Sequence, residues 1–243
     1  LDGLFENEDI SLRASALSII AELIKSEESM CDSLLPFCQQ TVGEVLSSDL
    51  GDESQQATIN AFEFLKTIAV SFKERSVEII TPFLENLAGA LAIDKYKMNA
   101  ADTISIYTGY SGDETMLDEQ VNLIPVVEEF LKSDFLMEQK CGCMCITSLS
   151  HVLTKNPISL DFYKLVLEIL VVKTEQELIC QAFRAAKSLY KRCRSVDEEH
   201  ESQFIQLTYV FLEKLMSGDI AYLEGVSPSE TPKMEAIVQD AME

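Results

Sequence analysis

The hydrophobic residues of this chain recur with the spacing of an α-helix and, on a longer scale, with a second period. The clearest markers are small residues separated by steps of 41, 43, 41 and 41 positions: Ala16, Ala57, Ala100, Cys141 and Ala182. Residues four, seven and eight positions after each marker lie on the same face of a helix. The pattern therefore predicts one buried helical face that returns about every 40 residues, as in stacked helical pairs.

The sequence between the markers predicts an all-α fold built from five antiparallel helix pairs. The pairs are expected at residues 10–48, 53–92, 97–132, 135–172 and 174–217. The first helices are expected at 10–25, 53–72, 97–107, 138–153 and 175–193, and the second helices at 32–46, 77–92, 117–132, 160–172 and 198–216. Asp9 precedes the first helix and is expected to cap it, because its carboxylate can accept from the open amides of the first turn. Residues 1–9 form a polar lead-in or the end of a preceding repeat, and 218–243 a linker with a short helix at 233–242.

The second helices carry a pattern of their own. Proline follows two residues that are mostly apolar at Pro36, Pro82 and Pro125, which are 46 and 43 positions apart. Proline is tolerated in a first helical turn, where its missing amide has no partner to lose. We therefore expect each proline near the start of a second helix. The fourth and fifth pairs lack this residue.

These two patterns resemble HEAT repeats. Residues 11–17 (SLRASAL) are similar to a HEAT first helix, and 34–37 (LLPF) to the start of a second helix. The resemblance covers residues 10–217 and implies a right-handed α-α superhelix, a HEAT-like solenoid with its second helices on the concave side. It also implies a protein-binding role, since the family includes transport receptors of the importin-β type, phosphatase scaffolds and vesicle-coat adaptors. Because the chain opens on Leu1, we expect a longer parent array.

The net negative charge of the chain limits the kinds of partner that it is expected to bind. The chain has 41 acidic and 19 basic residues, a net charge of −22, while 47% of its residues are hydrophobic. Such a field repels phosphate backbones and anionic lipids and attracts basic protein faces, so no direct nucleic-acid contact is expected. The alternative is that the acids merely solvate the outer helix faces. Seven cysteines without a small disulfide-rich pattern favour a reducing compartment, the cytoplasm or the nucleus. No apolar run is long enough to span a bilayer, so no membrane insertion is expected.

Candidate chemistry is sparse. Cys141, Cys143 and Cys145 could suggest a metal site, but on a helix only the first and last share a face, where other repeats carry Ala or Ile. We interpret that pair as a buried helix contact. His200 lies in an acidic helix start and is interpreted as solvated, and His151 has no evident partner. Without a glycine-rich phosphate loop or a nucleophile elbow, no enzyme, metal or cofactor is expected.

The predicted binding site is a polar ladder on the second helices, with acids toward its middle. Its members are Gln39, Gln40, Glu85, Asn86, Glu128, Glu129, Glu168 and Glu213. Such a ladder could pair with Lys or Arg of a partner; a merely solvated face is the alternative. The aromatic residues Phe62, Phe64, Phe72 and Phe83 are expected in the core.

Two functions remain open from the sequence. The first is a protein–protein interaction module, part of a larger HEAT-repeat scaffold or adaptor that binds partner proteins along its concave face. The alternative is a fragment of an importin-β-like nuclear transport receptor, which would bind basic cargo and a small GTPase of the Ran type.

Overall fold

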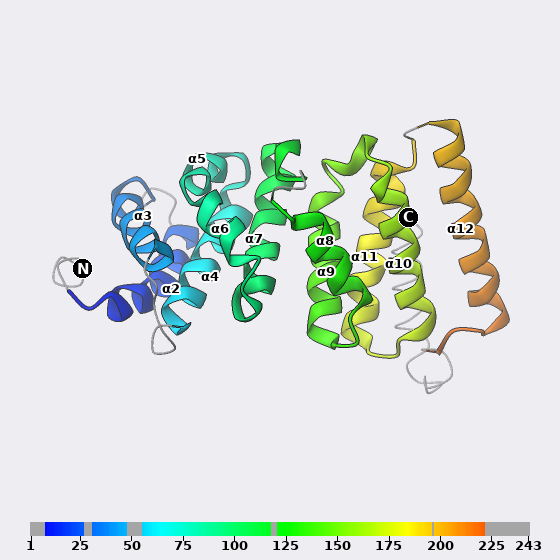
Figure 1. Ribbon diagram of the computed structural model, residues 1–243, viewed down its shortest axis with the longest axis horizontal. Helices are drawn as coiled ribbons and strands as arrows, with labels where there is room; N and C mark the ends of the chain where they lie inside the picture. The colour runs from blue at the N-terminus through cyan, green and yellow to red at the C-terminus, as the bar shows by residue number, and fades with distance from the viewer. Residues whose placement is uncertain (1–7, 27–30, 48–54, 118–120, 196, 222–243) are drawn as a thin grey trace. The chain divides into compact units, whose positions relative to one another are not determined.

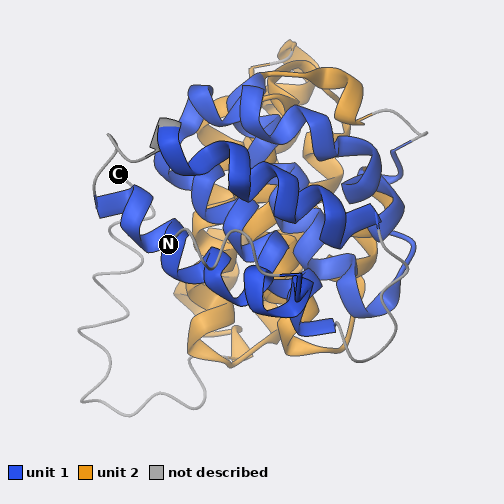
Figure 2. Ribbon diagram, turned by 90° about the vertical axis from the view of Figure 1, so that its left-hand side faces the viewer, with its two compact units in different colours: residues 1–111, 120–123 blue, residues 112–119, 124–243 orange. Residues whose placement is uncertain are grey.

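The computed structural model describes residues 8–26, 31–47, 55–117, 121–195 and 197–221 (Figure 1). All regular structure in these residues is helical, so the predicted all-α class is confirmed. The chain forms two compact units, which Figure 2 colours separately. Unit 1 comprises residues 1–111 with 120–123, and unit 2 comprises 112–119 with 124–243.

Unit 1 is built on three long helices that lie side by side. The helix α4 (Gln55–Phe72) packs on α2 (Ile10–Ser26) on one side and on α7 (Asp94–Ser111) on the other. The second-helix positions are taken by α3 (Cys31–Ser47), which packs on α2 and α4, and by α5 (Ser76–Ile80) and α6 (Leu84–Ala90), which both contact α7. The 3₁₀ turn η3 (Lys73–Arg75) connects α4 to α5, and a second 3₁₀ turn, η4 (Thr81–Phe83), connects α5 to α6.

Unit 2 is organised around α11 (Gln176–Cys193), which packs on both α9 (Leu136–Leu149) and α10 (Ile158–Val172). The helix α12 (Glu198–Ser217) packs on α10. Two 3₁₀ turns, η5 (Glu114–Leu117) and η6 (Leu153–Lys155), and the helix α8 (Leu123–Lys132) complete the described elements. Among the described residues, no helix combines the length and the apolar character needed to cross a bilayer.

The repeated small residues are buried, as the sequence predicts. All five markers and all five residues four positions later are buried: Ala16, Ile20, Ala57, Ala61, Ala100, Ile104, Cys141, Cys145, Ala182 and Ala186. A small residue in the middle of a helix lets the neighbouring backbone approach closely, which fits the packing of α4 between α2 and α7. Of the four aromatic residues expected in the core, Phe62, Phe64 and Phe83 are buried, and Phe72 is half-exposed at the end of α4.

The prolines do not all begin a helix. Pro125 lies in the first turn of α8, as predicted, but Pro36 lies inside α3. Pro82 lies in η4, so the single helix expected at 77–92 is divided into α5 and α6. A proline inside a helix removes one backbone hydrogen bond and its ring crowds the preceding turn, and the tighter 3₁₀ turn accommodates both effects.

Helix ends follow local chemistry where a capping residue is present. The Asp9 carboxylate accepts from the backbone amides of Ser11 (2.9 Å) and Leu12 (3.3 Å), so the predicted cap is confirmed. The helix expected to end at 107 continues as α7 to Ser111 and stops before Gly112, which has φ of +67°. The helix expected at 117–132 begins only at Leu123, and the one expected at 138–153 ends at Leu149. The expected helix at 233–242 and most of the lead-in lie outside the described residues.

Candidate binding groove

The eight residues of the predicted ladder are divided between the two units. Unit 1 holds Gln39 and Gln40 on α3 and Glu85 and Asn86 on α6, whereas unit 2 holds Glu128 and Glu129 on α8, Glu168 on α10 and Glu213 on α12. Five of them are exposed, and Gln39, Asn86 and Glu128 are half-buried. The ladder as a continuous surface therefore stays a prediction.

Gln40, Glu128 and Asn86 each have a partner within their own unit. The Gln40 amide donates to Glu44 at 2.8 Å, and Glu128 pairs with Lys132 one turn further along α8. The Asn86 amide donates to the backbone carbonyl of Leu46 at 3.4 Å and so links α6 to the end of α3.

The cysteines of α9 are part of the core. Cys141, Cys143 and Cys145 are all buried, and the sulfur atoms of the first and last lie 4.0 Å apart. The interpretation of that pair as buried helix contacts is confirmed. Burial, with a smaller contribution from Cys141, raises the pKa of the Cys143 thiol to about 12. No group of three or more metal-ligating side chains comes together in the described part of the chain.

The interpretation of His200 as solvated is wrong. Its side chain is 7% exposed, its Nε2 lies 3.1 Å from the hydroxyl of Ser159 on α10, and its ring lies 5.1 Å from that of Phe204. Its backbone amide donates to the capping carboxylate of Asp197 at 2.8 Å. The first turn of α12 therefore holds His200 against α10, although its neighbours in sequence are acidic. The His151 residue as a whole is exposed. Partial burial of its ring lowers its pKa, and the positive charge of Arg192 lowers it further.

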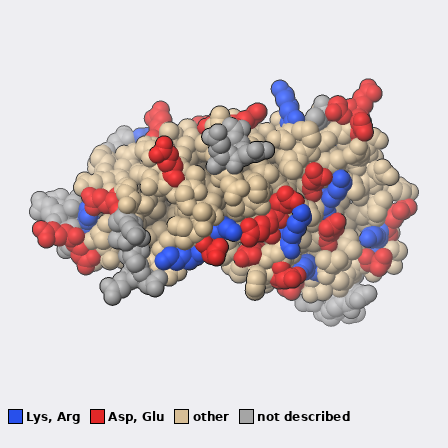
Figure 3. Space-filling view, in the orientation of Figure 1, with Lys and Arg blue, Asp and Glu red and all other residues tan. Residues whose placement is uncertain are grey.

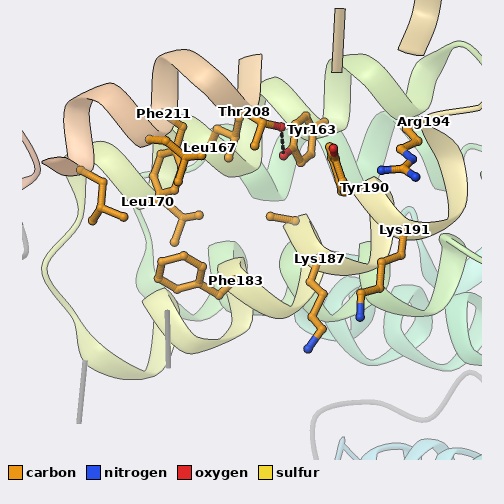
Figure 4. A pocket seen from close by; sticks show the side chains of 13 residues that line it. Tyr163, Leu167, Leu170, Phe183, Lys187, Tyr190, Lys191, Arg194, Thr208 and Phe211 are labelled. Atoms are coloured by element: carbon orange, nitrogen blue, oxygen red, sulfur yellow. Dashed lines mark hydrogen bonds between the residues drawn. The ribbon is translucent and has the colours of Figure 1, made fainter. Parts of the chain in front are cut away.

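A groove in unit 2 provides a site that the sequence analysis did not identify. It lies between α11 and α12, above α10, and has a volume of about 480 Å³ (Figure 4). Its floor consists of Tyr163, Leu167 and Leu170 of α10, which are all buried. The α12 wall is formed by Thr208, Phe211, Leu212 and Leu215. A concave surface lined mainly by apolar side chains is typical of a binding site.

Aromatic side chains shape the groove. Phe183 of α11 and Phe211 of α12 meet edge to face, with ring centroids 6.2 Å apart. The ring centroids of Tyr163 and Tyr190 lie 6.4 Å apart. The Tyr163 hydroxyl is hydrogen-bonded to the Thr208 hydroxyl at 2.8 Å. Burial raises the pKa of the Tyr163 phenol, while the hydrogen bond to Thr208 opposes the shift. The phenol therefore stays neutral and joins α10 to α12 beneath the groove.

The α11 side of the groove is basic. Lys187, Lys191 and Arg194 line it at spacings of four and three residues, which places them along one edge of the helix. Both lysines line the groove, and Figure 4 shows their side chains extending from α11 on the side away from α12, with the ammonium groups at their ends. We name these three residues the basic row. By contrast, Figure 3 shows acidic side chains spread over both units on the face in view.

Apolar surface continues from the groove onto α12. Leu212, which lines the groove, shares a helical face with Ile205, Tyr209 and Met216, whose exposures are 50%, 63% and 79%. Among the described residues, twelve large hydrophobic residues are exposed, and four of them lie on α12: Ile205, Tyr209, Val210 and Met216. Contiguous exposed apolar surface beside a groove indicates an interaction site.

Comparisons with known proteins support the fold without giving a function. No family model matches the chain, and no curated protein matches it. Among solved structures, the chain is similar to the crystal structure of an engineered protein, a target of the Northeast Structural Genomics Consortium. The TM-score is 0.67 at 14% sequence identity, and the match covers 98% of this chain and 95% of that chain. At this identity the similarity shows the fold alone.

Proposed function

We propose that this chain is a protein–protein interaction module and that the groove between α11 and α12 binds a helical segment of a partner protein. The observation that carries the proposal is the groove itself, which joins a buried apolar floor to an exposed apolar stripe on α12. A helical segment with apolar residues on one face binds such a surface by placing those residues in the groove.

The dimensions of the groove suit a helix better than a small ligand. Its α12 wall runs from Thr208 to Leu215, which spans about 10 Å at 1.5 Å per residue. The exposed stripe extends this surface to Ile205 and Met216, over about 16 Å of the same helix. A partner helix of three turns would match that length and bury the stripe together with the groove.

The repeated helical pairs and their resemblance to HEAT repeats support the wider proposal that the chain belongs to a scaffold or adaptor. Repeat proteins of this kind present extended surfaces for partners. The alternative of a transport receptor rests on the net charge of −22, which favours basic cargo. The two proposals differ in where a partner binds: at the apolar groove, or at exposed acids such as Glu129 and Glu168.

The test is selection of helical peptides on the full chain. A display library of 16-residue amphipathic helices is enriched for binders, and the affinities of the best peptides are measured by fluorescence anisotropy. Phe183→Asp and Leu212→Asp are then compared with Ile19→Asp, a matched control on α2 whose side chain is 68% exposed. Both groove residues are half-exposed, so these changes perturb the surface more than the core.

We expect each groove substitution to weaken binding between tenfold and a hundredfold, because burial of one large apolar side chain contributes about 1.5 to 3 kcal/mol. The control substitution is expected to leave the affinity unchanged. The proposal is wrong if the selected peptides bind the two groove variants as tightly as the unmodified chain.

A further inference from the structure

We infer that the groove selects helices that carry acidic residues along the edge facing α11. The inference rests on the proposed function and names the chemistry of the partner. The net charge of −22 suggests a basic partner for the chain as a whole. The basic row lines the groove, so an acidic partner is inferred at this site.

The geometry of the basic row matches that of a helix. Lys187, Lys191 and Arg194 follow the i, i+4, i+7 spacing, so their charges are arranged over about 10 Å along α11. Glu or Asp at the same spacing on a partner helix would meet them in register while its apolar face enters the groove. Five of the 19 basic residues of the chain lie between positions 184 and 194, so this positive segment is local.

Arg194 is already held in position. Its guanidinium lies over the ring of Tyr190, 4.9 Å from the centroid, and its Nε lies 3.8 Å from a carboxylate oxygen of Glu201. The guanidinium offers five N–H donors in a fixed plane, and an arginine that is oriented in advance loses less entropy when a second carboxylate binds. Tyr190 also lines the groove, so the cation and the apolar surface form one site.

The contrast between local and overall charge gives a kinetic signature. At low salt an approaching acidic helix is repelled by the chain as a whole, and it gains from the basic row only at contact. At about 0.1 to 0.15 M salt the Debye length is about 8 to 10 Å, so repulsion between charges farther apart than this is largely screened. We therefore expect the association rate constant for an acidic helix to rise with salt and its dissociation rate constant to rise as well. A basic helix drawn to the exposed acids should show an association rate constant that falls with salt.

The experiment uses two peptides with the same apolar face. The acidic probe carries Glu at i, i+4 and i+7 on the flank of a 16-residue helix, and the basic probe carries Lys at those positions. Rate constants are measured by stopped-flow on the full chain at 50 and 300 mM NaCl. The double variant Lys187→Glu with Lys191→Glu is compared with Arg184→Glu with Arg192→Glu, which makes the same change in net charge on α11 outside the groove lining.

We expect the unmodified chain to prefer the acidic probe. The groove double variant should lose on the order of tenfold in affinity for that probe and gain for the basic one, whereas the matched control should change either affinity less than about threefold. Preference of the unmodified chain for the basic probe would overturn the inference, and so would an equal loss in the control. If both probes bind equally and Phe183→Asp weakens both, the charge inference alone is wrong. If Phe183→Asp affects neither probe, the proposed function fails as well.

Discussion

The stability of the Gly142→Ala variant tests how closely α8 approaches α9 in unit 2. A Cβ atom at this position would lie 3.0 Å and 3.1 Å from the Cδ2 and Cγ atoms of Leu131 and 3.2 Å from its backbone nitrogen. Leu131 is itself buried, and its backbone belongs to α8. Rotation of the leucine side chain would relieve the first two contacts but not the third. Gly142→Ala must therefore move one helix away from the other.

Two opposing effects determine the magnitude. Replacing glycine by alanine inside a helix contributes about 1 kcal/mol of stability, whereas overpacking a close contact costs about 1 to 3 kcal/mol. The backbone contact places the cost near 2 kcal/mol, so Gly142→Ala should lower the free energy of unfolding by about 1 kcal/mol. Gly43 in α3 is the matched control, because a Cβ there would lie 3.6 Å from Phe83, an ordinary van der Waals distance. Gly43→Ala should raise stability by about 0.5 to 1 kcal/mol.

The assay is urea unfolding followed by circular dichroism, with hydrogen exchange of peptides from α8 and α9 to assign the effect to unit 2. For a chain of this length, 1 kcal/mol corresponds to a shift of about 2 to 4 °C in Tm. In a Leu131→Ala background, Gly142→Ala should keep most of its penalty, because the shorter side chain removes the two side-chain contacts but not the contact with the backbone nitrogen. If Gly142→Ala is as stable as the unmodified chain, or more stable, the close approach of α8 to α9 is refuted.

Three further predictions concern buried charges, caps and thiols. The Lys66 ammonium lies 3.1 Å from the buried carboxylate of Asp102. Burial raises the pKa of Asp102 above its usual 3.8, although the charge of Lys66 opposes this shift. Lys66→Met should therefore destabilise unit 1 by about 2 kcal/mol at pH 7; this deficit should shrink toward pH 4, where the carboxyl binds a proton, as urea unfolding at several pH values would show. Asp197→Ala removes the N-cap of α12 and should cost about 1 kcal/mol, with faster hydrogen exchange in the first turn of that helix. In the native chain at pH 8, iodoacetamide should modify the half-exposed Cys180 well before the buried Cys143, as peptide mass spectrometry would measure.

The sequence predicted those features whose physical cause is local or strictly periodic. A buried helical face needs small and apolar residues at fixed offsets, so Ala57, Ala100 and Ala182 marked first helices that the structure contains. The Asp9 cap could be predicted because a carboxylate two residues from an open amide needs no distant partner. The sequence also held an unused indication of the groove, since Lys187, Lys191 and Arg194 share one helical edge in an otherwise acidic chain.

Tertiary structure alone decided which polar residues are buried and where a groove remains. His200 follows two glutamates, yet it packs against Ser159, a residue 41 positions earlier, because the first turn of α12 lies on α10. The groove is formed by side chains of three helices, from Tyr163 to Leu215, and exists because α11 and α12 both pack on α10 with space between them. Periodicity fixes the face that one helix buries, but the separation of two helices depends on side chains far apart in the chain, which only packing brings together.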